Sequence, residues 1–246
     1  SFRRVLKSTG GMFVQEESSK NLLLSAGFEN IHLSGDTRFD RVFKFAIEET
    51  VNLKIEKFKS IKRLIILGSS WKREEKMMKE FMMQTDLMLN CRVVIAPHDI
   101  SEKHLIEIEQ LFNNSIVRYS NYSNQVTDIM LIDNIGLLSS IYRYADIAFV
   151  GGGFTNALHN ILEPAAYGVP VIYGNNHTKF PEALELEETG GGKSVANFAE
   201  FKKYAKRLLN DDLFRSEAGQ YSLQFVREKI GATDIIMKKV FKQKDR

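Results

Sequence analysis

Short runs of apolar residues alternate with longer polar stretches along most of this chain, and this alternation limits the possible folds more than any other feature. The runs are three to five residues long, so they suit strands buried on both faces better than helices. They comprise Leu64–Leu67, Arg92–Ala96, Ile129–Ile132, Ile147–Val150 and Val171–Tyr173. Strands that alternate with helices form a parallel sheet covered on both sides, so the sequence predicts an α/β, Rossmann-like domain.

The stretches around these runs are predicted to be helices, although the apolar period of the first is imperfect. They are Val42–Phe58, Lys72–Met88, Ser101–Phe112, Gly136–Tyr144, Asn156–Tyr167, Phe198–Asn210, Asp212–Lys229 and Thr233–Lys242. Two short strands, Met12–Val14 and Ile31–Leu33, are predicted ahead of the main alternation. Residues 1–33 therefore look like the end of a preceding unit.

Polar or glycine-containing loops follow four of the predicted strands. In open parallel sheets, ligands bind beyond the carboxyl ends of the strands, so loops that gather at this edge predict a binding site. The four loops are Gly68–Trp71, Ala96–Asp99, Asp133–Gly136 and Gly151–Asn156. Ser69 and Ser70 either point their hydroxyls at a ligand or cap the helix that follows.

The last of these loops contains three consecutive glycines, Gly151–Gly153, and leads into a helix predicted to be capped by Thr155 or Asn156. Glycines let a backbone approach a ligand closely, and a helix start offers unpaired N–H groups to an anion. This combination favours phosphate, with a tight turn that binds nothing as the alternative.

Polar side chains come after the glycines, at His159, Asn160 and Glu163. A carboxylate beside a phosphate site suits hydroxyl groups, such as those of a ribose. His159 and Glu163 also have the four-residue spacing of a metal-ligand pair on a helix, but no third ligand is evident. His159 is expected to order the loop or to contact phosphate, and no metal or other cofactor is expected.

Four segments resemble, in the same order, motifs of the 3-deoxy-D-manno-octulosonic acid (Kdo) transferases. They are Ser34–Asp40, Gly68–Trp71 with Glu74 and Glu75, Ile132–Gly136, and Val150–Glu163 with the following Ala165–Gly174. The resemblance covers residues 20–230 and implies the donor-binding, C-terminal half of a GT-B glycosyltransferase. The glycine turn and the acidic residue are shared by GT-B enzymes in general.

The resemblance implies that the donor is CMP-Kdo and that Kdo is transferred, with inversion, to a lipid A precursor in lipopolysaccharide biosynthesis. It assigns donor contacts to Arg38, Ser69, Ser70, His98, Asp133, Ile135, Gly136, Gly152, Gly153, Asn156, His159, Asn160 and Glu163. Among these, Glu163 would bind the ribose, the 133–136 loop the base, and the glycine turn the phosphate. Arg38 is alternatively a surface cation.

The sequence departs from the family pattern in three places. His98 is followed by Asp99 where the family usually has an Arg beside a His, which puts the role of His98 in doubt. Leu137 stands where an acidic residue is common, and Ala157-Leu158 replaces a Gly-Gly pair. These departures indicate a divergent branch with the same fold.

The resemblance also predicts the domain organisation: residues 1–33 as the remnant of an N-terminal domain and linker, and residues 34–246 as the donor-binding domain. The family's general base, acceptor site and membrane attachment belong to the N-terminal domain, so this chain alone is expected to bind CMP weakly and to transfer nothing. The full-length protein would work at the cytoplasmic side of the bacterial inner membrane. Two alternatives remain, a UDP-sugar enzyme such as a UDP-N-acetylglucosamine 2-epimerase or a UDP-sugar transferase, and a non-enzymatic nucleotide-binding module.

Composition agrees with a soluble globular chain. Its 246 residues are 43% apolar with a net charge of +3, and no apolar run approaches the ~20 residues of a membrane-spanning helix. The single cysteine, Cys91, excludes an internal disulfide and is predicted to be a core residue. Basic residues cluster in 54–63 and at the C-terminus, where a weak attraction to anionic lipid is an alternative to plain solvation. The sequence contains no basic stripe interleaved with aromatic residues, so nucleic-acid binding is not predicted.

Overall fold

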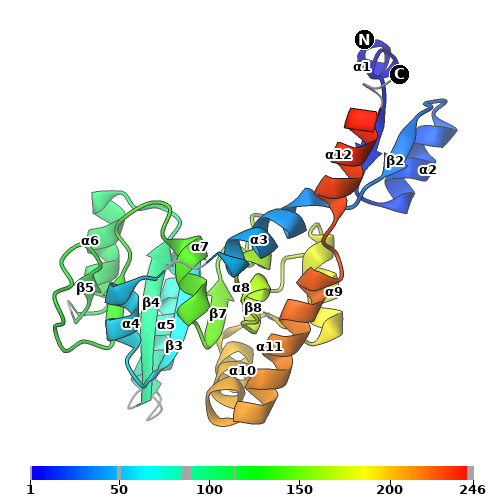
Figure 1. Ribbon diagram of the computed structural model, residues 1–246. Helices are drawn as coiled ribbons and strands as arrows, with labels where there is room; N and C mark the ends of the chain where they lie inside the picture. Colours follow the sequence, from blue (N-terminus) through cyan, green and yellow to red (C-terminus); the bar gives the residue numbers. More distant parts are fainter. Residues whose placement is uncertain (1, 49–50, 85–89, 114, 243–246) are drawn as a thin grey trace.

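The computed structural model describes residues 2–48, 51–84, 90–113 and 115–242. Its main body is a seven-stranded parallel sheet with helices on both faces, and a smaller N-terminal unit stands beside it (Figure 1). This confirms the α/β prediction. Within the described residues, none of the helices combines the length and the apolar character needed to cross a bilayer.

The sheet has the strand order β5-β6-β4-β3-β7-β8-β9. Its strands are β3 (Arg63–Ser70), β4 (Cys91–Pro97), β5 (Val117–Arg118), β6 (Ile129–Leu131), β7 (Ile147–Val150), β8 (Val171–Gly174) and β9 (Gly192–Val195). The chain first builds outward from β3 through β4 and β6, and then returns to place β7 on the other side of β3. The order therefore reverses between β3 and β7, which is where ligands bind in open α/β sheets.

Two apolar layers enclose the sheet. In β3, Leu64 and Ile66 pack into one layer while Ile65 and Leu67 pack into the other, and all four side chains are fully buried. This is why the strand is a continuous apolar run. Cys91 is buried in the second layer, where burial raises the pKa of its thiol to about 12.

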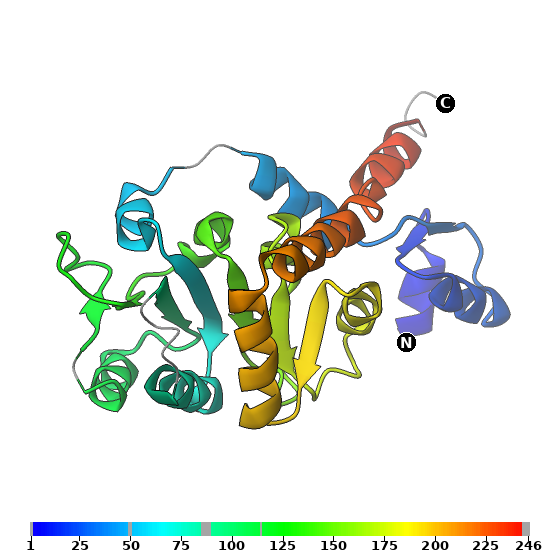
Figure 2. The same ribbon diagram turned by 90° about the horizontal axis from the view of Figure 1, so that it is seen from below.

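The helices divide between the two faces (Figure 2). The first face is covered by α3 (Thr37–Ile47), α4 (Leu53–Lys59), α7 (Leu138–Ile141), α8 (Leu162–Ala166) and α9 (Pro181–Thr189). The second is covered by α5 (Lys72–Gln84), α6 (Glu102–Leu111) and α10 (Phe198–Asn210). The long helix α11 (Asp212–Arg227) contributes residues to both layers, and a 3-10 turn, η2 (Tyr142–Tyr144), follows α7.

The single helix predicted for Val42–Phe58 is wrong, because the structure has α3 and α4 in its place. Each has its own N-cap: the Asp36 side chain accepts from the Arg38 amide, and the Asn52 side chain accepts from the Ile55 amide. The imperfect apolar period of residues 42–58 indicated that this stretch is not one continuous helix. The predicted helix Lys72–Met88 is observed as far as Gln84, and its last four residues lie outside the described part of the chain.

The N-terminal unit contains α1 (Phe2–Lys7), α2 (Glu17–Ser25) and a parallel pair of strands, β1 (Met12–Val14) and β2 (Ile31–Leu33). Both strands were predicted. The last helix, α12 (Ala232–Lys242), extends from the main body toward this unit (Figure 1). Its start is tied to α3, since the Asp40 carboxylate accepts from the Thr233 amide at 2.8 Å. The assignment of residues 1–33 to a preceding domain stays a prediction.

Candidate functional site

The glycine turn after β7 lies where three backbone segments meet. A Cβ atom built on Gly151 would lie 2.1 Å from the Ser69 carbonyl oxygen, and one on Gly153 would lie 2.4 Å from the Gly174 amide nitrogen. On Gly152, which has a φ of +82°, it would lie 2.0 Å from the Ala157 carbonyl oxygen. The glycines thus let neighbouring backbones pack together, which is a structural requirement independent of any ligand.

The predicted start of the helix after this turn, near Asn156, is wrong. Residues 151–156 form turns, and α8 begins only at Leu162. The hydroxyl of Thr155 donates to the Gly152 carbonyl at 2.9 Å, so it closes the turn instead of capping a helix. The Asn160 side chain accepts from the Leu162 amide at 3.1 Å and fixes the later start. His159 therefore precedes the helix that carries Glu163, and the two do not share a helix face.

Three aromatic rings from three different loops pack together at the carboxyl edge of β3, β4 and β7. The rings of Trp71 and His98 are 4.8 Å apart and nearly parallel, and those of His98 and His159 are 4.5 Å apart. The indole N–H of Trp71 donates to Nε2 of His159 at 3.2 Å. Burial and the neighbouring His98 lower the pKa of His159. The structure thus brings together two predicted site residues, His98 and His159, and Trp71, which was not among the predicted donor contacts.

A buried carboxylate lies beneath the glycine turn. Glu74, which is only 1% exposed, accepts the Gly152 amide at 2.9 Å through Oε1. Its Oε2 is buried without a hydrogen-bond partner in the described residues, and burial raises the pKa of its carboxyl group. The Gly152 amide, predicted to bind phosphate, is thus engaged within the protein. The Gly153 amide has no partner in the part of the chain that the structure describes.

Glu75 is buried next to Glu74 and accepts a hydrogen bond from the end of β3. It accepts the Ser70 hydroxyl at 2.9 Å and lies 3.0 Å from Nε2 of His104 in α6. The Ser70 hydroxyl is therefore turned into the protein, while Ser69 is half-buried with a φ of +49°. Sequence reasoning did not predict functions for the two carboxylates. The available signal was an acidic pair in the first helical turn after a site strand.

Glu163 lies on the other side of the edge, at the start of α8. It is half-buried and hydrogen-bonded to the side chains of Asn160, at 3.1 Å, and Ser139. Burial raises its pKa, and the nearby Arg41 acts in the opposite direction. A small cavity of about 40 Å³ lies beside it, lined by Arg41, Ser139, Tyr167 and others. This is an arrangement of one carboxylate among hydrogen-bonding side chains, which suits the hydroxyls of a sugar.

The predicted base loop follows β6. The Asp133 carboxylate accepts both the amide, at 3.1 Å, and the hydroxyl of Ser120, so it anchors a neighbouring loop. Ile135 is 87% exposed, and Gly136 has a φ of +88° with nothing within 4 Å of a built Cβ. The backbone of this loop is thus open, in agreement with a role through backbone groups, which remains a prediction.

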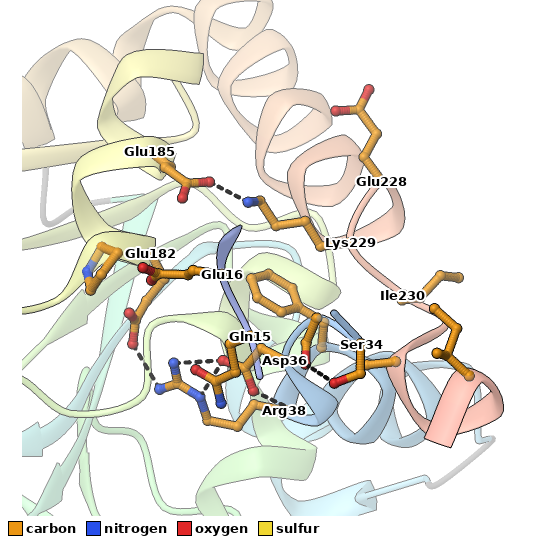
Figure 3. A pocket seen from close by; sticks show the side chains of 15 residues that line it. Gln15, Glu16, Ser34, Asp36, Arg38, Glu182, Glu185, Glu228, Lys229 and Ile230 are labelled. Atoms are coloured by element: carbon orange, nitrogen blue, oxygen red, sulfur yellow. Dashed lines mark hydrogen bonds and ion pairs between the residues drawn. The ribbon is translucent and has the colours of Figure 1, made fainter. Parts of the chain in front are cut away.

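Arg38 lies apart from these groups, at the start of α3. Its guanidinium pairs with Asp36 at 2.7 Å and with Glu182 of α9 at 2.8 Å, and both carboxylates raise its pKa. It lines a separate pocket of about 310 Å³ between α9, α12 and the N-terminal unit (Figure 3). The cation beside Glu163 is Arg41, one helical turn further along α3. Within the described residues, His159 and Glu163 do not belong to a group of three or more potential metal ligands.

The fold and the position of the site define the class of protein: the chain has the α/β fold of the C-terminal domain of GT-B glycosyltransferases. No family model matches it. It is 32% identical to the 3-deoxy-D-manno-octulosonic acid transferase of Aquifex aeolicus over 167 residues, which is 65% of this chain and 47% of that protein. The chain is a relative of the Kdo transferases and spans about half the length of this one.

Solved structures agree on the fold. The C-terminal CMP-Kdo binding domain of WaaA from Acinetobacter baumannii is similar with a TM-score of 0.61 at 19% identity, over 76% of this chain and 98% of that domain. UDP-GlcNAc 2-epimerase from Neisseria meningitidis, bound to UDP-GlcNAc, is similar with a TM-score of 0.67 at 16% identity, over 95% of this chain and 61% of the epimerase. At these identities the likeness concerns the fold alone.

Proposed function

We propose that this chain is the donor-binding half of a Kdo transferase and binds CMP-Kdo at the carboxyl edge of β3, β4 and β7. The observation that carries the proposal is the 32% identity to a Kdo transferase, in a segment with the fold of a domain described as CMP-Kdo binding. The site supports it, because its loops meet where the strand order reverses.

The reaction would break the C–O bond between Kdo and CMP while positive charge develops on the sugar. The protein's contribution on this side is to stabilise the departing phosphate with hydrogen-bond donors. His159 and the free amide of Gly153 suit this role, and the backbone of Ser69 packs against Gly151 of the same turn. The amide of Gly152 would contribute only if Glu74 released it. No metal is needed for this chemistry.

Glu163 would hold the ribose. A carboxylate accepts hydrogen bonds from two hydroxyls at once, and the side chains of Asn160 and Ser139 keep Glu163 in place. The open backbone of residues 133–136 would contact the cytosine. The ribose and base contacts would thus come from α8 and the loop after β6, and the phosphate contacts from the turn after β7.

The acceptor would be a lipid A precursor in lipopolysaccharide synthesis, and the enzyme would act at the cytoplasmic face of the inner membrane. The resemblance puts the general base and the acceptor site in the other half of the enzyme. The chain alone is therefore proposed to bind CMP weakly and to transfer nothing, and turnover by the chain alone would contradict this part of the proposal.

Calorimetric titration with CMP and UDP tests the proposal. We expect CMP to bind more tightly than UDP, and Glu163→Ala to weaken CMP binding by about tenfold or more, because two charge-assisted hydrogen bonds to the ribose are lost. Glu217→Ala, a change of an exposed carboxylate on α11, is the matched control and should bind as the unchanged chain does.

A second candidate, a UDP-sugar enzyme, is favoured by one observation, the similarity to the UDP-GlcNAc 2-epimerase fold over 95% of the chain. A preference for UDP in the same titration would replace the Kdo transferase proposal with this one. No binding of either nucleotide, or binding unaffected by Glu163→Ala, would favour a non-enzymatic module.

A further inference from the structure

We propose that Trp71 is a positioning residue that fixes His159 as its Nδ1–H tautomer and so makes the ring a neutral hydrogen-bond donor, through Nδ1, to an anion bound beside the glycine turn. The identity of that anion, the phosphate of the nucleotide donor, rests on the proposed function. The tautomer itself does not, because it follows from contacts within the chain.

The argument begins with the contact between Trp71 and His159. The indole nitrogen of Trp71 lies 3.2 Å from Nε2 of His159. An indole N–H can only donate, so Nε2 must accept and carries no proton. In a neutral imidazole one nitrogen is protonated, so the proton of His159 is on Nδ1.

The ring of His159 is held in one orientation by its neighbours. His98 packs against both His159 and Trp71, with centroid distances of 4.5 Å and 4.8 Å, while the rings of Trp71 and His159 are 6.4 Å apart. Its Cδ2 atom lies 3.2 Å from a Cβ built on Gly152, and its Nε2 atom accepts from the indole, so these two ring atoms are enclosed by the protein. The opposite edge carries Nδ1, which has no hydrogen-bond partner among the described residues.

The surroundings also keep His159 neutral. A protonated ring would carry hydrogens on both nitrogens and would lose the bond from Trp71. The titratable group facing it from the loop after β4 is His98, which also disfavours a second positive charge, and partial burial acts in the same direction. The buried carboxylate of Glu74 in α5 is bonded to the Gly152 amide and not to His159. A neutral donor of this kind binds an anion equally well at neutral and at alkaline pH.

The first test is NMR of the ligand-free chain with 15N-labelled histidine. We expect the Nδ1–H tautomer for His159, whose signals are assigned by their loss in His159→Gln. Trp71→Phe keeps an aromatic ring in the stack and removes only the N–H donor. In this variant we expect the Nε2–H form to become populated and the pKa of His159 to rise. An Nε2–H ring in the unchanged chain, or no change in Trp71→Phe, would overturn the proposal.

The second test is CMP binding at pH 8, where His159 is neutral. We expect Trp71→Phe to weaken binding about fivefold, the effect of losing one oriented hydrogen bond, and His159→Gln to weaken it at least as much. Phe154→Leu, a change of a half-buried ring in the same turn, is the control for general loosening.

The two tests separate the two proposals. If the unchanged chain binds no CMP, the proposed function fails, while the NMR experiment still decides the tautomer. If CMP binds and Trp71→Phe shifts the tautomer without changing the affinity, the role of Trp71 in binding is refuted and the proposed function stands.

Discussion

The glycine turn and the Glu163 cavity are two parts of one sheet edge, and each contains a carboxyl group with a raised pKa. Glu74 lies under the turn, 1% exposed, with one oxygen on a backbone amide. Glu163 is half-buried, with two polar side chains and Arg41 around it. Glu74 therefore stabilises the turn within the protein, whereas Glu163 remains available to a ligand.

The largest effect is expected when the packing of the turn is broken. Gly152→Ala would place a Cβ 2.0 Å from the Ala157 carbonyl oxygen at a φ of +82°, so the free energy of unfolding should fall by about 3 kcal/mol or more. Gly136→Ala has a similar φ of +88° but nothing within 4 Å, and should cost about 1 kcal/mol. Urea unfolding measures both, and equal losses would show that the clash is relieved by movement of the turn.

Removal of the carboxyl group under the turn should have the next largest effect. Glu74→Ala leaves the buried Gly152 amide without its partner, at a cost of about 2 kcal/mol of unfolding free energy. Glu217→Ala, at an exposed position, should change it by less than about 0.5 kcal/mol. If Glu74→Ala is as stable as this control, Glu74 does not hold the turn.

The dependence of stability on pH should distinguish the two carboxyl groups. A raised pKa in the folded state means that the folded chain holds a proton that the unfolded chain has released, so stability decreases as pH rises above 4.5, the ordinary pKa of a glutamic acid. Glu74→Gln removes this loss and should therefore gain stability relative to the unchanged chain between pH 5 and pH 8. Urea titrations at both pH values measure the gain, and a difference independent of pH would contradict it.

The same substitution at Glu163 should show the smallest effect. Both carboxyl groups have hydrogen bonds that favour the ionised form, but the charge of Arg41 also favours it at Glu163, whereas the charge of Glu75 disfavours it at Glu74. Glu163→Gln should consequently show a smaller pH-dependent gain than Glu74→Gln in the same titrations. A larger gain would reverse the comparison and identify Glu163 as the more isolated carboxylate.

The strands could be predicted from the sequence because a strand buried on both faces is a continuous run of apolar residues. Ile147–Val150 is apolar throughout and became β7 with the predicted bounds. The helix starts were harder, since they depend on competition between side-chain hydrogen bonds. Thr155 and Asn160 are both suitable caps, and only the closing of the glycine turn decides that Thr155 bonds Gly152 and that α8 starts at Leu162.

Sequence alone determined the sheet, its buried strands, and the edge where the loops gather, because hydrophobic periodicity and strand-helix alternation are local properties of the chain. Tertiary structure alone decided which groups meet there. Trp71 and His159 are 88 residues apart, and Glu74 is 78 residues from the amide that it accepts. No local pattern records such pairs, because they form only when the parallel strands align their carboxyl ends and the turn after β7 packs against the loop after β3.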